Sequence, residues 1–380
     1  MPAEHEMDIN SNASESIHGA LSDMYSREKE WSEFEKTRSG VKGLVDAGII
    51  NIPKFFILPS EEQLMLKSSS SDANSIQLQV PVIDLEGSRG DRRNEVVAEI
   101  RKATETWGIF QMVNHGIPVD VMNGLLESEC QFHDQPKEVK MEFYSRDPNK
   151  VFQYYSTHSR ESETALWRDT IICNIEAWTA SPESLPPVCR KALRSYVEHA
   201  MKLRDLLSEL LSEALELDHD HLDRIECMES SKMVCHYYPA CPEPDLTIGT
   251  PKHSDPYFLT ILLQNCIVGL QVLNDDHWVD VPPVPGALIA IVGDLLQLIS
   301  NDKFKSPEHR VLATRYGPRL STACLFSPRS ENKYRSYGPI VELLFDNNPP
   351  IYKETSQGEY LRCYISNELL GSRVLTRFKR

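Results

Sequence analysis

Two residues of the sequence, His253 and Asp255, have the types and the spacing of metal ligands. Side chains two positions apart on a β-strand point to the same face, so this imidazole and this carboxylate could bind one ion. His309 follows Asp255 after 53 intervening residues, next to a β-like run, and could supply a third ligand. Two imidazole nitrogens and one carboxylate leave three octahedral positions open, an arrangement that suits Fe(II) enzymes binding a cosubstrate and O2 together.

Taken alone, a His-x-Asp pattern more often marks polar residues in a surface turn than a metal site. Arg319 and Ser321 change that balance, because they follow His309 closely and lie two residues apart on one expected strand. A guanidinium can clamp a carboxylate with two parallel hydrogen bonds, and a hydroxyl can add a third. The pattern therefore indicates a dicarboxylate cosubstrate that binds iron through one end and Arg319 through the other.

The elements that must position these residues are visible in the hydrophobic pattern. Helical periodicity predicts amphipathic helices over residues 92–107 and 119–132 and a long helix from Val188 to Leu217. Short strands are expected within residues 78–85 and 108–117. From Lys232 onward, β-rich runs separated by Pro and Gly predict an antiparallel sandwich or barrel. We expect a mixed α and β protein whose N-terminal helices support a C-terminal β-core.

Composition and charge limit the classes of partner. A formal charge of −16 argues against nucleic acid and against an anionic membrane surface, since both require clustered Lys and Arg. The first residues are acidic and polar and lack the features of a secretory signal, and no apolar run is a convincing transmembrane span. Nine scattered cysteines suit reduced thiols rather than a disulfide framework. We expect a cytoplasmic monomer.

Longer segments carry more specific patterns: VPVIDL, WGIFQMVNHGIP, HYYPACPEPDLTIG and the run from HSDPYFLTILLQ to RLSTACLF. In order and spacing they resemble the plant 2-oxoglutarate-dependent dioxygenases, over about residues 40 to 370. KTRSGVKGLVDAGI resembles a narrower branch. That branch groups homologues of 1-aminocyclopropane-1-carboxylate oxidase with alkaloid, benzoxazinoid and steroidal-glycoalkaloid hydroxylases.

This resemblance implies a double-stranded β-helix (jelly-roll) core with iron in its mouth. Residue by residue, it assigns iron to His253, Asp255 and His309. It assigns the far carboxylate of 2-oxoglutarate to Arg319 and Ser321, and it makes Tyr238 a hydrogen-bond donor to the cosubstrate. It also divides the chain into a disordered tail (1–24), an N-terminal helix-and-strand region (25–225), the jelly-roll core (226–345) and a C-terminal helical segment (346–380).

The implied activity is Fe(II)- and 2-oxoglutarate-dependent oxygenation of a plant specialised metabolite, with release of succinate and CO2. Hydroxylation is the default outcome, O2 and a small molecule are the expected partners, and ascorbate is the expected reductant in assays. We expect the substrate pocket to involve side chains near the mouth, each of which could equally be core packing: Phe152, Tyr154, Thr170, Ile172, Phe258 and Phe326.

One departure and two other classes of protein remain open. His236 stands where the family has Asn, and it could reach the cosubstrate or be an ordinary hydrogen-bonded strand histidine. An oxidase of the same fold that does not use 2-oxoglutarate, such as 1-aminocyclopropane-1-carboxylate oxidase, would share the iron triad. A non-catalytic small-molecule-binding protein on this scaffold would be expected to have lost an iron ligand or Arg319, and all are present.

Overall fold

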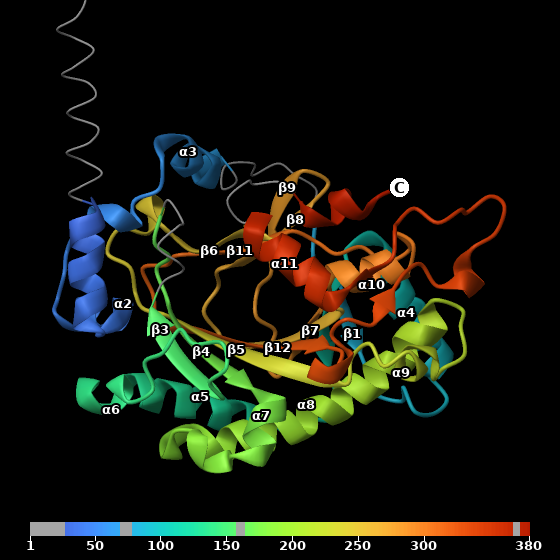
Figure 1. Cartoon of the computed structure of the whole chain (residues 1–380), viewed down its shortest axis with the longest axis horizontal. Helices are drawn as coiled ribbons and strands as arrows, with labels where there is room; N and C mark the ends of the chain where they lie inside the picture. Colours follow the sequence, from blue (N-terminus) through green and yellow to red (C-terminus); the bar gives the residue numbers. More distant parts are fainter. Residues whose placement is uncertain (1–26, 69–77, 157–163, 368–372) are drawn as a thin grey trace, which may run out of the picture.

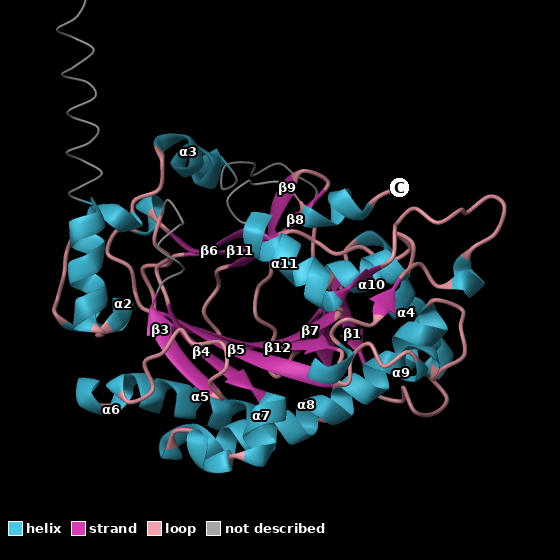
Figure 2. Ribbon diagram, viewed as in Figure 1, coloured by secondary structure: helices cyan, strands magenta, loops and turns pink. Residues whose placement is uncertain are grey.

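Two β-sheets face one another, and helices cover the outer side of the larger one (Figure 2). The computed structural model describes residues 27–68, 78–156, 164–367 and 373–380, so the expected tail over residues 1–24 lies outside the described residues. Within these ranges, the larger sheet has the strand order β1-β2-β10-β7-β12-β5-β4-β3 and the smaller one the order β6-β11-β8-β9. This confirms the predicted mixed fold with a jelly-roll core and helical support.

Strands from both halves of the chain build the larger sheet. It comprises β1 (Val82–Asp84), β2 (Ile109–Val113), β3 (Phe152–Ser156), β4 (Asp169–Asn174), β5 (Ser230–Tyr238), β7 (Leu259–Gln264), β10 (Leu288–Val292) and β12 (Arg319–Ser327). The smaller sheet comprises β6 (Ile248–His253), β8 (Leu270–Asn274), β9 (His277–Asp280) and β11 (His309–Leu312), and β13 (Ser336–Tyr337) pairs with β14 (Thr355–Ser356). The region before residue 226 therefore supplies strands to the core as well as helices.

The helices gather mainly on one side of the larger sheet, where α5 and α8 run beneath it (Figure 1). Residues 27–37 are helical, and the further helices are α2 (Gly40–Asp46), α3 (Ser60–Ser68), α4 (Arg93–Thr106), α5 (Val119–Asp134), α6 (Lys137–Met141), α7 (Ile175–Ala180), α8 (Pro187–Ala214), α9 (His221–Arg224), α10 (Asp294–Ile299) and α11 (Gln357–Asn367). The three helices predicted from periodicity are confirmed as α4, α5 and α8. None of the described helices is long and apolar enough to cross a membrane.

The two faces of the larger sheet differ in burial. On β5 and β12, side chains that face the helices, such as Cys235 and Cys324, are buried in one large apolar cluster. Alternate side chains, such as Val234 and Leu325, are only half-buried. Because strand side chains alternate between faces, one face belongs to the core, and the other forms an accessible inner face toward the smaller sheet.

Candidate metal centre

The structure brings His253, Asp255 and His309 together at one end of the smaller sheet. His253 is the last residue of β6 and pairs with His309, the first residue of β11, while Asp255 lies in the turn that follows. Oδ1 of Asp255 is 3.7 Å from Nε2 of each histidine. One ligand atom of each residue lies within 4.8 Å of the others, and no other such group of three occurs in the part of the chain that the structure describes.

Hydrogen bonds determine which nitrogen of each imidazole can bind an ion. Nδ1 of His253 lies 3.0 Å from the carbonyl oxygen of Pro251, and Nδ1 of His309 lies 3.3 Å from that of Pro307. A carbonyl oxygen can only accept, so Nδ1 carries the proton and Nε2 offers its lone pair on the side of Asp255. Burial and the neighbouring His309 lower the pKa of His253 to about 4. Neutral imidazoles are the form that binds metal, so this donor set fits Fe(II).

The carboxylate of Asp255 is held by groups outside the triad. Thr260 donates its hydroxyl hydrogen to Oδ2 of Asp255 at 2.6 Å, which leaves Oδ1 directed at the histidines. The backbone amide of Asp294 donates to the carbonyl oxygen of Asp255 at 2.8 Å. The side chain of Asp294 accepts a hydrogen bond from Ser254 at 2.9 Å. The turn between the two ligands is therefore fixed on both its backbone and its side-chain sides.

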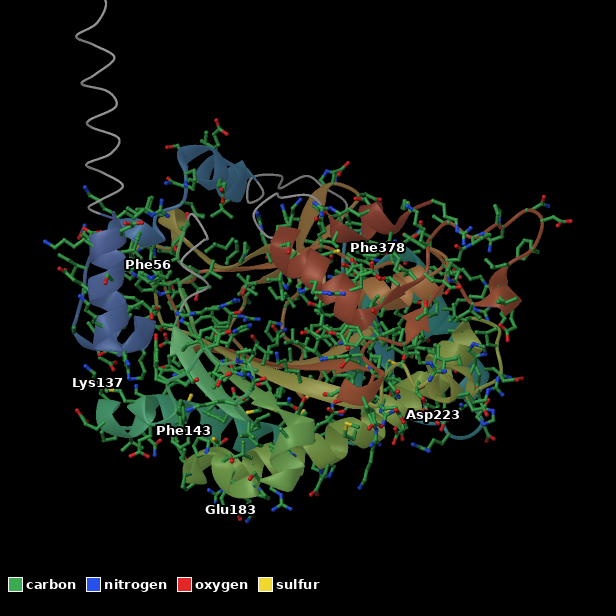
Figure 3. The ribbon with its side chains drawn as sticks, viewed as in Figure 1. Phe56, Lys137, Phe143, Glu183, Asp223 and Phe378 are labelled. Carbon is green, nitrogen blue, oxygen red and sulfur yellow. The ribbon has the colours of Figure 1, made fainter. Side chains whose placement is uncertain are left out.

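A C-terminal clasp, formed by Tyr360, Tyr364 and Arg373, supports the same turn. Tyr360 donates to Oδ2 of Asp294 at 2.7 Å, and Arg373 donates to Oδ1 at 3.2 Å. Tyr364 donates to the carbonyl oxygen of Ser254 at 3.0 Å. Phe378, labelled in Figure 3, packs on the ring of Tyr360 with ring centres 5.1 Å apart. The predictions from sequence missed this clasp, although Asp294 was visible as the one charge that interrupts an apolar run.

Arg319 lies on the inner face of β12, fully buried and without a carboxylate partner among the described residues. Its Nη1 donates to Oγ of Ser321 at 3.3 Å and its Nη2 to Oε1 of Gln264 at 2.9 Å. Its guanidinium lies 5.2 Å from the ring centre of Tyr238, which pairs with it across β5 and β12. A buried cation without a counter-ion is unfavourable, so this end of the inner face fits an anionic ligand.

A hydrogen-bonded chain reaches Tyr238 from the smaller sheet. The hydroxyl of Tyr238 lies 2.9 Å from Oγ1 of Thr250 on β6, and Arg168 also donates to that oxygen. Gly249 allows the close approach, because a Cβ there would lie 2.8 Å from the Tyr238 ring. The two sheets are thus tied together beside Arg319, and Tyr238 is held on the same inner face as Arg319.

His236 lies on the same inner face, opposite both Ser321 and Thr170. Its Nδ1 is 3.1 Å from Oγ1 of Thr170, and its ring centre is 5.8 Å from that of Tyr238. This residue is therefore hydrogen-bonded within the sheet, as one of the two interpretations expected, and its contact with a cosubstrate stays a prediction.

The six side chains predicted for the substrate pocket separate by strand face. Thr170 and Ile172 lie on the inner face, in register with His236 and Val234. Phe152, Tyr154 and Phe326 belong to the core cluster on the helix side of the sheet, and Phe258 is buried in the same cluster against Tyr337. The reason is the phase of the strands. Gln153 pairs with Ile172, Tyr155 with Thr170, and Leu325 with Lys232, so Gln153, Tyr155 and Leu325 face inward. Their neighbours in the chain, Phe152, Tyr154 and Phe326, therefore face the helices.

Tyr257, next to the metal ligands, was also missed by the sequence predictions. Burial and the charges of Asp255 and the inward-facing Tyr155 raise the pKa of its hydroxyl. The hydroxyl therefore stays protonated near the iron ligands and can donate a hydrogen bond there.

Comparisons with known proteins agree with this geometry. Residues 229–328 match the 2OG-Fe(II) oxygenase superfamily, and residues 80–189 match the N-terminal region of non-haem dioxygenases in morphine synthesis. The 1-aminocyclopropane-1-carboxylate oxidase homolog 1 of Arabidopsis thaliana is 49% identical, over 91% of this chain and 94% of its own. Deacetoxyvindoline 4-hydroxylase of Catharanthus roseus is 44% identical, over 92% of this chain and 89% of its own. The crystal structure of JOX2 with 2OG, Fe and JA superposes with a TM-score of 0.76 at 29% identity, covering 90% of this chain and 97% of that one.

Proposed function

This chain belongs to the 2OG-Fe(II) oxygenase superfamily, and we propose that it hydroxylates a small plant metabolite at an iron held by His253, Asp255 and His309. Arg319 and Ser321 bind the far carboxylate of 2-oxoglutarate, and Tyr238 donates a hydrogen bond to the cosubstrate. The observation that carries this proposal is the convergence of three ligand atoms within 4.8 Å on the same interior that holds a buried Arg319, which has no counter-ion among the described residues.

Bound Fe(II) supplies the activation of O2 that couples decarboxylation of 2-oxoglutarate to oxygenation of the substrate. The overall reaction takes a substrate C–H bond, O2 and 2-oxoglutarate and gives the alcohol, succinate and CO2. The side chains contribute binding and orientation: Thr260 directs Asp255 toward the histidines, and Arg319 fixes the cosubstrate at its far end. The two facing sheets limit access of water to the reacting atoms.

Hydroxylation is the outcome we propose because a relative at 44% identity over most of both chains is named as a hydroxylase. The predicted cytoplasmic location and monomeric state remain part of the proposal. Size-exclusion chromatography with light scattering tests the monomer, and a dimer at micromolar concentration would contradict it.

The test of the proposed function is the balance of products. Purified protein is supplied with Fe(II), ascorbate, 2-oxoglutarate and a plant metabolite extract, and succinate is measured against O2 consumed. We expect one succinate for each O2, and no succinate from His309→Ala. His277→Ala, which removes an exposed histidine, is the matched control and should behave as wild type.

Three outcomes would contradict the proposal. Oxygen uptake without an equal amount of succinate would favour an oxidase that does not use 2-oxoglutarate. Full turnover by His309→Ala would overturn the iron assignment. Tight binding of a metabolite by wild-type protein without any O2 uptake would favour the non-catalytic binding protein.

A further inference from the structure

A second cation without a partner among the described residues lies on the inner face, at the opposite end from Arg319. This is Lys232 on β5, which pairs with Leu325 on β12 and with Asn174 on β4. Strand alternation places it on the same face as Val234, His236 and Tyr238. It is half-buried, like its inner-face neighbours, so solvent and small ligands reach it.

No group among the described residues neutralises this ammonium. Lys232 has neither an ion pair nor a hydrogen bond there, and burial alone lowers its pKa. The inward-facing residues of β3, β4, β5 and β12 include no Asp or Glu, as the strand registers show. The formal charge of −16 for the whole chain therefore does not describe this local surface. A partly desolvated cation without a partner is less favourable than one whose counter-charge is supplied by a ligand.

The position of Lys232 separates it from the cosubstrate end. Lys232 lies six positions before Tyr238 on β5, which corresponds to about 20 Å along a strand. Across the sheet, Lys232 on β5 pairs with Leu325 on β12, and Leu325 pairs with Thr260 on β7. Thr260 is the residue that donates a hydrogen bond to the iron ligand Asp255. A 2-oxoglutarate molecule anchored at Arg319 is too short to reach Lys232. A ligand at Lys232 must therefore approach the iron from the substrate side.

We propose that Lys232 binds a carboxylate of the substrate, and that the substrate is an acid with an apolar skeleton. This inference rests on the proposed oxygenase function and names the substrate class for the same site. The ammonium can approach a carboxylate as a point charge on a flexible stem. Ile172, Val234 and Leu325 offer apolar surface beside it on the same inner face. An acidic ligand held there can extend its apolar carbons past Leu325 toward Thr260, which contacts the iron ligand Asp255.

The test compares acids with their neutral counterparts. Phenylacetate, cinnamate and decanoate, each mixed with its methyl ester, are dialysed anaerobically against protein loaded with Fe(II) and 2-oxoglutarate, and bound ligand is quantified by mass spectrometry. We expect wild type to retain at least one acid about tenfold better than its ester, the effect of one hydrogen-bonded charge. This preference should vanish in Lys232→Met and return in Lys232→Arg. Lys191→Met removes an exposed lysine of α8 and should behave as wild type.

Each result bears on the proposal. No acid preferred by wild type, or a preference that survives in Lys232→Met, overturns the role of Lys232. Because the removed charge is unpaired, Lys232→Met should melt at or above the wild-type temperature, which separates lost binding from lost folding. Succinate formation by wild type without acid preference would refute only this inference. Acid preference without succinate formation would refute the proposed function instead.

Discussion

The C-terminal clasp yields a prediction whose size follows from the structure. Tyr360→Phe removes the hydroxyl that donates to Asp294 at 2.7 Å and keeps the ring that packs on Phe378. Asp294 is fully buried, so water cannot replace the lost donor. Ser254 and Arg373 remain as the other side-chain donors to this carboxylate. A hydrogen bond to a charged group contributes about 1.5–3 kcal/mol.

This loss should be visible both in stability and at the metal centre. With an unfolding entropy of about 2.1 cal/mol/K per residue, a loss of about 2 kcal/mol in a chain of 380 residues lowers Tm by about 2–3 °C. Asp294 also holds Ser254 and the backbone of Asp255. The affinity for Fe(II) should therefore fall by about tenfold, which is the lower end of the range for residues that orient metal ligands without binding the metal themselves.

The assay is thermal unfolding by circular dichroism together with anaerobic Fe(II) titration. Tyr316→Phe, which alters a tyrosine with 78% exposure, is the matched control and should change neither quantity. A Tyr360→Phe variant with wild-type Tm and wild-type Fe(II) affinity would refute the reasoning. A lower Tm with unchanged Fe(II) affinity would show that the clasp stabilises the fold without positioning Asp255.

Three other changes test separate parts of the structure. Thr260→Val removes the hydrogen bond to Asp255 and should weaken Fe(II) binding by about 10–100-fold in the same titration, and an unchanged affinity would contradict its positioning role. Arg319→Lys keeps the charge but loses the planar fork, so KM for 2-oxoglutarate should rise by about tenfold or more while kcat changes little, and an unchanged KM would exclude a bidentate contact. Burial raises the pKa of Glu129 to about 7 from an ordinary 4.5, so folding favours its neutral form, and stability on the order of 3 kcal/mol is lost as pH rises from about 4.5 to 7. Glu129→Gln should flatten that dependence in urea unfolding measured from pH 5 to pH 8, and an unaltered profile would show that this carboxyl is ionised in the folded protein.

Periodicity was sufficient for the elements that lie on the surface of the core. The helix expected from Val188 to Leu217 is α8, because its apolar residues recur at helical spacing and pack on one side. The spacing of His253, Asp255 and His309 likewise predicted a converging group, since the two histidines end and begin neighbouring strands.

Strand phase was the part that sequence could not supply. In β3 and β12 both faces carry bulky side chains, so nothing in the pattern indicated that Tyr155 and Leu325 face inward while Tyr154 and Phe326 face the helices. A slip of one residue reverses the face of every side chain. The C-terminal clasp was missed for a different reason, because its contact between Tyr360 and Asp294 spans 66 residues and has no local signal.

The most direct test of the central claim is anaerobic titration of 2-oxoglutarate into protein loaded with Fe(II), followed by the visible absorption that arises when the cosubstrate chelates the metal. The site described here predicts one iron per chain in wild type and saturable absorption, both absent in His309→Ala and both retained in His277→Ala. Full absorption from His309→Ala at wild-type iron content would contradict the assignment of the metal centre.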